Sequence, residues 1–371
     1  MSVVVINHDY ERFVGEAIQS ALDQDHDDVQ VIVVDDASTD GSRAVIDRYA
    51  DRVTVVPHRC NAGQGAAVNS GAAVADGDLV WFLDADDILL PGALSAAAEA
   101  HRSQPDLAKV HGPIEYIDAD RALLGRRVPS DPTMLAAGDL RGHVLRHRNH
   151  GWPAMSGNAY ARWTLDLLLP IPAEHYRQAA DAYLNELAPL CGPLVRCEQP
   201  LVGYRLHGGN QFAGRPISAE WLRTKIRRTV VSHERAGQLA VHLGLTGHLD
   251  DVRDPVDVAF HGYRLASLRL DPQHHPRLGD GDDRRWALAR AGLSATWRSP
   301  HLRTAERLTR TAWFASVAVA PTGAARRLVG WYLPDGPRQP VWAGWRSRRR
   351  RRHGRGPVPP SSSGAPRAVR G

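Results

Sequence analysis

The chain has 371 residues, of which 43% are hydrophobic and 23% are charged, and its formal net charge is +5. This length is enough for one large α/β domain with an extension. The three cysteines, Cys60, Cys191 and Cys197, lack the spacing of a zinc or redox site, and their low, odd number suggests a reducing compartment. We expect no signal peptide before the first strand, and no apolar run is long enough to span a bilayer.

The first ninety residues alternate between strand-like and helix-like patterns. Short apolar runs predict strands at residues 2–6, 29–34, 53–57 and 79–83. Helical patterns separate them, including one at 42–49 and an alanine-rich one that ends at Ala75. Repeated β-α units predict a parallel, doubly wound sheet with right-handed crossovers. Ligands of such sheets bind at the carboxyl ends of the strands.

The fourth predicted strand runs directly into three acids, Asp84, Asp86 and Asp87. Asp84 and Asp86 at the end of a rigid strand would form a hard oxygen site, which suits Mg²⁺ or Mn²⁺ carrying a diphosphate. The alternative is an acidic turn that opens the next helix, with Pro91 near its first turn. This motif alone does not decide between the two interpretations.

The later part of the chain has weaker patterns. A strand is predicted at residues 109–116, and helices are predicted beyond residue 217, including 286–293 and 302–319. The Pro-, Gly-, Asp- and His-rich stretch 271–283 is expected to be a loop between helices.

Four stretches together resemble the inverting family 2 glycosyltransferases with the GT-A fold: Val4–Tyr10, Val33–Gly41, Asn61–Gly65 with Asn69–Gly71, and Phe82–Asp87. Their order and spacing match over about the first hundred residues, and a weaker match continues to about Gln211. The proline that often follows the first strand in this family is absent here. The resemblance implies a Rossmann-like, mostly parallel sheet flanked by helices in residues 1–215. The nucleotide-sugar half would be 1–120 and the acceptor half 121–215.

The resemblance implies a donor site on the first four strand ends. Asp35 or Asp36 would hydrogen-bond the base, because two successive acids at a sheet edge repel each other and need a reason to be there. The alternatives are helix capping for the acids and ordinary loop or helix positions for the glycines. The residues expected to contact the donor are Asn7, Asp9, Asp35, Asp36, Gly63, Gly65, Asn69 and Asp84.

The resemblance also implies a metal site. Asp84 and Asp86 would meet the ribose and an Mn²⁺ or Mg²⁺ ion that bridges the two phosphates. His207 is a candidate third ligand or pyrophosphate contact, although an isolated histidine more often has neither role.

Asp181 is the expected catalytic base. The family places an acid at the start of a helix past the acceptor segment, and the corresponding stretch here is Arg177–Leu184, with Ala180 where a second acid often stands. A base must take the proton of the attacking hydroxyl while the sugar passes through an oxocarbenium-like state. Glu174 and Glu186 are competitors, and the alternative for Asp181 is a solvated helix acid.

The polar, glycine-rich segment 151–158 falls where the family places acceptor contacts. The expected acceptor residues are Trp152, Ser156, Gly157 and Asn158. Trp152 would stack on a sugar ring or an aglycone, or would instead anchor the core beneath a loop.

The resemblance implies transfer of a single sugar from a UDP-, GDP- or dTDP-sugar to a glycan, lipid-linked or small-molecule acceptor. The expected setting is cell-envelope polysaccharide, glycolipid or secondary-metabolite glycosylation. A non-catalytic sugar-nucleotide or partner-binding relative is the alternative. A processive synthase is disfavoured, because the Gln-x-x-Arg-Trp motif of such enzymes is missing.

The positive charge is concentrated near the C-terminus. From Arg338 onward there are ten arginines and no acid, which leaves 36 basic against 41 acidic side chains before it, a net charge of −5. We predict a helical extension at 216–335 and a disordered Arg-rich tail at 336–371. The tail would bind anionic lipid, or it would be simply solvated. We expect no nucleic-acid partner, and a cytoplasmic location with peripheral contact at the inner face of the plasma membrane.

Overall fold

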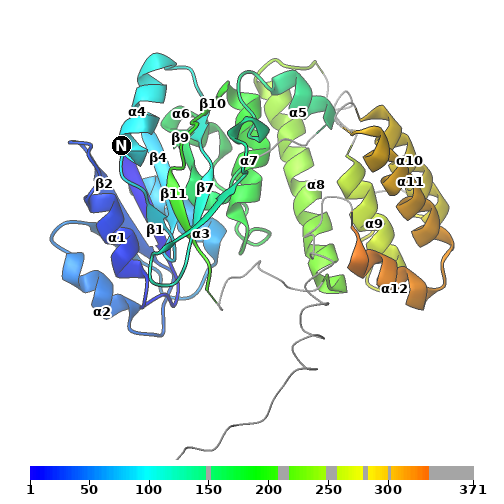
Figure 1. Cartoon of the computed structure of the whole chain (residues 1–371), viewed down its shortest axis with the longest axis horizontal. Helices are drawn as coiled ribbons and strands as arrows, with labels where there is room; N and C mark the ends of the chain where they lie inside the picture. The colour runs from blue at the N-terminus through cyan, green and yellow to red at the C-terminus, as the bar shows by residue number, and fades with distance from the viewer. Residues whose placement is uncertain (148–151, 208–216, 248–256, 279–282, 300–301, 334–371) are drawn as a thin grey trace, which may run out of the picture.

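The computed structural model describes residues 1–147, 152–207, 217–247, 257–278, 283–299 and 302–333. In this part of the chain, an α/β domain occupies one end of the molecule and the helices α8 to α12 occupy the other (Figure 1). The predicted Arg-rich tail at 336–371 lies outside the described residues.

The main sheet has seven described strands in the order β10-β6-β9-β4-β1-β2-β3. The four predicted strands are confirmed, and β1 lies between β2 and β4 and runs parallel to both. The sheet is nevertheless mixed, because β9 is antiparallel to β4 and β6. The strands of this sheet are β1 (Ser2–Asn7), β2 (Gln30–Asp35), β3 (Thr54–Pro57), β4 (Leu79–Asp84), β6 (Lys109–His111), β9 (Asn158–Ala161) and β10 (Leu194–Arg196).

A second sheet, which the sequence patterns did not predict, has the described order β5-β11-β7-β8. The single strand predicted at 109–116 is wrong. It is divided between β6 of the main sheet and β7 of the second sheet at Gly112-Pro113, where proline offers no N–H to a ladder. The strands of the second sheet are β5 (Ile88–Leu89), β7 (Ile114–Ile117), β8 (Leu123–Val128) and β11 (Val202–Arg205).

Helices cover both faces of the main sheet. Successive side chains of β1 point to opposite faces, so Val3 and Val5 join one core with α1, and Val4 and Ile6 join another with α3 and α7. Burial on both faces explains why these strands are continuous apolar runs. The helices of this domain are α1 (Val14–Leu22), α2 (Ser42–Ile46), α3 (Gln64–Val74), α4 (Ala93–Ser103), α5 (Arg141–His147), α6 (Arg162–Leu168) and α7 (Ala180–Cys191).

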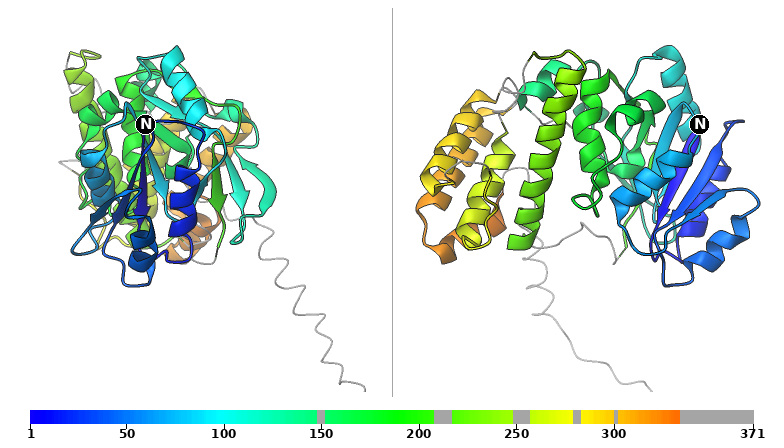
Figure 2. Two further views of the ribbon diagram at one scale, coloured as in Figure 1. Left: turned by 90° about the vertical axis from the view of Figure 1, so that its left-hand side faces the viewer. Right: turned by 180° about the vertical axis from the view of Figure 1, so that it is seen from behind.

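The helical extension has its own core, but its first helix is shared with the α/β domain. In α8, Ala236 and Leu239 belong to the core that contains α3 and α7, whereas Leu222 and Ile226 belong to the core of the extension. Figure 1 and the right view of Figure 2 show α8 between the two parts. The boundary at 215/216 therefore stays a prediction. The extension consists of α8 (Ala219–His242), α9 (Val258–Leu270), α10 (Arg285–Arg298), α11 (Thr304–Val319) and α12 (Thr322–Trp331).

Among the described helices, none combines the length and apolar character needed to cross a bilayer.

Candidate active site

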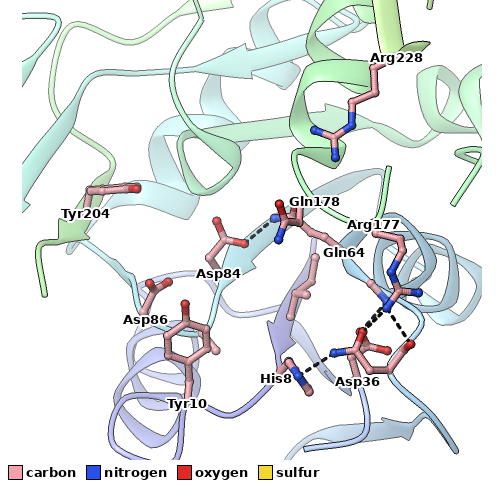
Figure 3. A pocket seen from close by; sticks show the side chains of 14 residues that line it. His8, Tyr10, Asp36, Gln64, Asp84, Asp86, Arg177, Gln178, Tyr204 and Arg228 are labelled. Carbon is pink, nitrogen blue, oxygen red and sulfur yellow. Dashed lines mark hydrogen bonds between the residues drawn. The ribbon is translucent and has the colours of Figure 1, made fainter. Parts of the chain in front are cut away.

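A pocket of about 570 Å³ opens at the carboxyl ends of β1, β2 and β4 (Figure 3). The position follows from the parallel order of these strands, which brings their polar ends to one edge. The lining residues come from both the α/β domain and α8. They are Ile6, His8, Tyr10, Asp36, Asn61, Gly63, Gln64, Asp84, Ala85, Asp86, Arg177, Gln178, Tyr204 and Arg228.

The acids after β4 form one wall of the pocket. Asp84 Oδ1 accepts a hydrogen bond of 2.9 Å from Gln64 Nε2, and Asp86 Oδ2 lies 3.0 Å from His207 Nε2. Burial, followed by the charges of Asp86 and Asp181, raises the pKa of Asp84 above its ordinary value. The neighbouring carboxyl groups therefore make this wall of the pocket favour a bound proton or cation.

The third acid, Asp87, has a structural task. Its buried carboxylate accepts hydrogen bonds from Ser156 Oγ (2.6 Å) and the backbone N–H of Arg205 (2.9 Å). Ser156 also accepts from the backbone N–H of Asp84 at 3.1 Å. These hydrogen bonds hold the turn that carries Asp84 and Asp86 in place.

His207 lies at the acidic wall although 121 residues separate it from Asp86. Its ring packs against Phe13 (centroids 5.0 Å apart) and Tyr10 (5.9 Å). Burial, with the nearby carboxylate of Asp86, raises the pKa of the Tyr10 hydroxyl. His207 is therefore placed beside the expected metal position, hydrogen-bonded to one of the two candidate carboxylates.

The donor set of this wall fits a hard cation. Among the described residues, no Lys or Arg forms an ion pair with the carboxylates of Asp84 or Asp86, and no group of three His, Cys, Asp or Glu converges as a complete ligand set. Two clustered carboxylates that no described Lys or Arg neutralises suit Mg²⁺ or Mn²⁺, which takes its remaining ligands from phosphate oxygens and water.

Asp35 and Asp36 point in different directions. Asp36 faces the pocket and accepts from the N–H groups of Ala62 (2.8 Å) and Gly63 (2.7 Å) and from His58 Nδ1 (2.7 Å). Burial alone would raise the pKa of Asp36, but these hydrogen bonds outweigh it and hold that pKa below its ordinary value. Asp36 remains ionised at the edge of the pocket.

Asp35 instead ties the turn after β1 to the turn after β2. It accepts from Asn7 Nδ2 (3.0 Å) and from Ser38 Oγ. Asp9 accepts from the N–H of Thr39 at 2.6 Å. Asn7, Asp9 and Asp35 support the pocket wall and are not among its lining residues.

Gly63 and Gly65 allow close contact with a segment of protein. A Cβ on Gly63, where φ is +90°, would lie 2.6 Å from Arg177 Cα, and one on Gly65 would lie 2.7 Å from the carbonyl oxygen of Tyr176. The first N–H groups of α3, on Gln64 and Gly65, donate to the carbonyls of Arg177 and Tyr176 at 2.9 Å each. Only Gly63 of the two glycines lines the pocket.

Asn69 strengthens the same contact from further along α3. Its amide donates to the carbonyl of Ile171 (2.9 Å) and accepts from the N–H of the same residue (2.8 Å). We call residues 171–177, held by α3, the docked segment. Because the docked segment covers the start of α3, these N–H groups are occupied by protein.

Asp181 lies in the first turn of α7, directly after the docked segment. Gln64 connects it to the acidic wall, because its side chain donates to Asp84 and accepts from the N–H of Ala180 at 3.0 Å. Burial raises the pKa of Asp181, and the charges of Lys225 and Arg228 oppose this effect. Asp181 does not itself line the pocket, but its charge acts on Asp84.

The two alternative candidates for the catalytic base, Glu174 and Glu186, lie outside the pocket lining. Glu174 is an exposed side chain beside His175 (3.8 Å).

The predicted acceptor segment is mainly structural. Asn158 is fully buried and accepts from Lys109 Nζ at 2.9 Å, and a Cβ on Gly157 would lie 2.7 Å from Pro153 Cβ. Ser156 supports the acidic turn, as described above, and Trp152 is half-buried. None of these four predicted residues lines the pocket.

Several lining residues were missed by the sequence reasoning. Near Asp36, Asn61 Nδ2 lies 2.6 Å from His8 Nε2, and Arg177 Nη2 donates to Asn61 Oδ1 at 2.8 Å (Figure 3). His8, Asn61 and Arg177 all stand within the motifs, so their positions in those motifs were the available signal.

Arg228 had no such signal, because it comes from α8 in the extension. Its Nε donates to the carbonyl of His175 (2.8 Å), and the hydroxyl of Tyr176 donates to the carbonyl of Arg228 (3.0 Å). The guanidinium lies over the Tyr176 ring, 5.8 Å from its centroid, and faces Gln178 across the pocket (Figure 3). The extension therefore supplies a fixed cation to the site.

Two curated relatives are similar to this chain over part of its length. An uncharacterized glycosyltransferase of Nostoc sp. is 33% identical over 216 residues, which cover 57% of this chain and 66% of the relative. The O-antigen biosynthesis protein RfbC of Myxococcus xanthus is 36% identical over 124 residues, 32% of this chain and 10% of RfbC. The chain thus spans less than two thirds of each of these proteins.

A solved structure shares the fold. S. aureus TarS 1–349 in complex with UDP-GlcNAc superposes with a TM-score of 0.52 at 15% identity, covering 88% of this chain and 91% of that one. This similarity shows the fold of the chain, which is the GT-A fold that the sequence predicted. Residues 2–154 match the model described as "Glycosyl transferase family 2".

Proposed function

We propose that this protein is a metal-dependent, inverting glycosyltransferase that moves one sugar from a nucleotide-sugar donor to an acceptor hydroxyl. The observation that carries the proposal is that Asp36, Asp84 and Asp86 line a single pocket, with the charge of Asp181 acting on Asp84. The sequence motifs predict a site role for the same four acids.

The donor would lie across the strand ends with its base beside Asp36. An ionised carboxylate there accepts from an N–H of the base, and Arg177 and Asn61 close this end of the pocket. UDP-, GDP- and dTDP-sugars all satisfy this requirement. TarS has been crystallised with UDP-GlcNAc, which makes UDP-sugars the first donors to test.

Asp84 and Asp86 would hold the Mg²⁺ or Mn²⁺ ion, with His207 near enough to orient Asp86. The bound cation would supply charge stabilisation for the departing nucleoside diphosphate. Gln64 holds Asp84 in place, and the buried hydrogen bonds of Asp87 fix the turn.

Asp181 would take the proton from the acceptor hydroxyl on the face of the sugar opposite the diphosphate, which gives inversion. Its position in the first turn of α7 is fixed by the Gln64 link to Ala180. The buried surroundings raise its pKa, which makes it a stronger base than an exposed aspartate.

The acceptor class and cellular setting are proposed from relatives. RfbC is named for O-antigen biosynthesis, so a cell-envelope glycan or a lipid-linked acceptor is the first class to test. We place the reaction in the cytoplasm, at the inner face of the plasma membrane.

The test is donor hydrolysis and donor binding by purified protein. We would screen UDP-, GDP- and dTDP-sugars by thermal shift with Mn²⁺, Mg²⁺ or EDTA, and measure release of nucleoside diphosphate. Asp86→Ala should abolish the metal-dependent hydrolysis, whereas Asp51→Ala, which changes an exposed acid, should not. Metal-independent binding without turnover of any donor would instead favour the non-catalytic relative.

A further inference from the structure

The charge of this chain changes sign before the Arg-rich tail begins. Residues 284–333, which contain α10, α11 and α12, have nine arginines and a single acid, Glu306. The preceding residues 1–283 have 27 basic against 39 acidic side chains. The extension therefore ends in a basic helical layer that follows a net acidic stretch of the chain, residues 1–283.

The same layer exposes large apolar side chains. On α10, Trp286 and Trp297 are 53% and 51% exposed, and on α11, Leu308 and Val319 are 57% and 62% exposed. The spacing of eleven residues within each pair places its two members on one side of a helix. We call Trp286, Arg290, Trp297, Leu308 and Val319 the outer face.

The outer face looks away from the rest of the protein. The opposite sides of α10 and α11 bury Leu288, Ala295, Phe314 and Val317 in the core of the extension. Figures 1 and 2 show both helices at the end of the molecule remote from the main sheet. Exposed apolar side chains gathered on one such layer mark a contact surface.

Arginine side chains lie close to both tryptophans of the outer face. Arg290 is exposed one turn after Trp286, and the guanidinium of Arg285 lies 5.2 Å from the Trp286 ring centroid. At the other end of α10, Trp297 Nε1 donates to Thr311 Oγ1 at 3.2 Å, and Arg307 lies over the ring at 5.8 Å. Each of the two tryptophan rings therefore has an arginine guanidinium beside it.

We propose that the outer face docks on an anionic lipid membrane. Tryptophan prefers the level of the headgroups, arginine pairs with lipid phosphates, and the aliphatic side chains of Leu308 and Val319 reach the acyl boundary. A second copy of this chain would bring arginines against arginines. A nucleic-acid backbone would give the aliphatic side chains no contact. The chain continues after residue 333 with ten further arginines, which adds to the same attraction.

The inference does not depend on sugar transfer, so its test measures binding alone. The full chain is co-sedimented with vesicles of phosphatidylcholine, and with vesicles in which part of that lipid is replaced by phosphatidylglycerol. We expect binding to the anionic vesicles only, weakened by salt. Arg290→Gln should weaken partitioning about fivefold, from about 1 kcal/mol per basic residue. Trp286→Ala should weaken it by a similar or larger factor.

Two matched variants serve as controls. Arg48→Gln removes an exposed arginine and Leu123→Ala an exposed apolar side chain, both in the α/β domain, and both should bind like the parent chain. All variants change exposed side chains, and circular dichroism before and after sedimentation checks the fold.

The proposal is overturned if the full chain does not co-sediment with anionic vesicles. It is also overturned if Arg290→Gln and Trp286→Ala bind as well as the parent, because the tail would then account for all binding. Light scattering without lipid provides a further check. A dimer that Trp286→Ala dissociates would assign the outer face to self-association instead, and tighter binding to duplex RNA than to vesicles would assign it to nucleic acid.

Discussion

Asp35 and Asp36 are neighbours in sequence and have different surroundings. The sequence predicted that at least one of them contacts the donor. The alternating direction of side chains along a strand did not show which of the two faces the donor. The structure turns Asp36 to the pocket and uses Asp35 to connect two turns. Side-chain direction at a strand end depends on the partners that the fold supplies, here Asn7 and Ser38.

Asp181→Asn tests the proposed base. We expect transfer to fall by about 10² to 10⁴, the usual contribution of a general base, with little change in the affinity for the donor. Donor binding by calorimetry and transfer rates measured together would separate these effects. Near-normal turnover of the variant would exclude Asp181 as the base.

The acid limb of the pH profile gives a second test of Asp181. A base works only when ionised, and burial raises the pKa of this carboxyl. Transfer should therefore decline as the pH falls through this raised pKa, at a higher pH than for an ordinary aspartate near 3.9. We would measure kcat/KM from pH 4 to 9, and a limb at the ordinary value would contradict the assignment.

Asp36→Asn should destabilise the protein in a pH-dependent way. The folded pKa of Asp36 is lowered, so its ionised form stabilises the fold above the unfolded pKa, and this stabilisation is lost as the pH falls through the folded value. We expect a cost of about 1.5–3 kcal/mol at pH 7, from hydrogen bonds to a charged acceptor. Urea unfolding at pH 7 and pH 3 would show a smaller difference at the lower pH.

At the scale of elements, the docked segment and α3 act together. Gly63 and Gly65 were expected to contact the donor, yet a Cβ on either glycine would lie within 3 Å of the backbone of the docked segment. Their need for glycine was predictable, but the contacting partner, more than a hundred residues away, was not.

Gly65→Ala should therefore destabilise the fold by about 1–3 kcal/mol through overpacking against Tyr176. Gly323→Ala in α12 is the control, because a Cβ there meets nothing within 4 Å. Thermal unfolding of both variants would check the difference. An equal Tm for the two would show that the docked segment moves to accommodate the added methyl group with little loss of stability.

The strands of the main sheet were predictable because burial on both faces leaves a continuous apolar run. The second sheet was not, since β5 has only two residues and β11 pairs with β5 and β7 over long sequence distances, although β7 and β8 form a local hairpin. This sheet nevertheless positions the site. β11 delivers His207 to Asp86, and Arg205 Nε donates to the carbonyl of Asp86 at 2.7 Å.

At the scale of the whole molecule, the pocket is built by both parts of the chain. The motifs of the first ninety residues account for its acidic wall, while Arg228 comes from a helix whose sequence pattern indicated only burial. No local pattern could have assigned it, because its role depends on the packing of α8 against α7 and the docked segment.

Arg228→Gln should lower kcat/KM for transfer about tenfold or more, because a charged hydrogen-bond donor is removed from the pocket wall. Arg227→Gln, the exposed neighbour on the same helix, should leave it unchanged. Steady-state kinetics with both variants would check this. Equal rates for the two would show that Arg228 of α8 does not contribute to the reaction.

Gln64 touches the acid that ends β4 and the first N–H of α7 at the same time. A displacement of Asp84 when a donor enters would be transmitted through this amide to the turn that bears Asp181. One uncharged side chain thereby couples the position of the acid that ends β4 to the position of the proposed base.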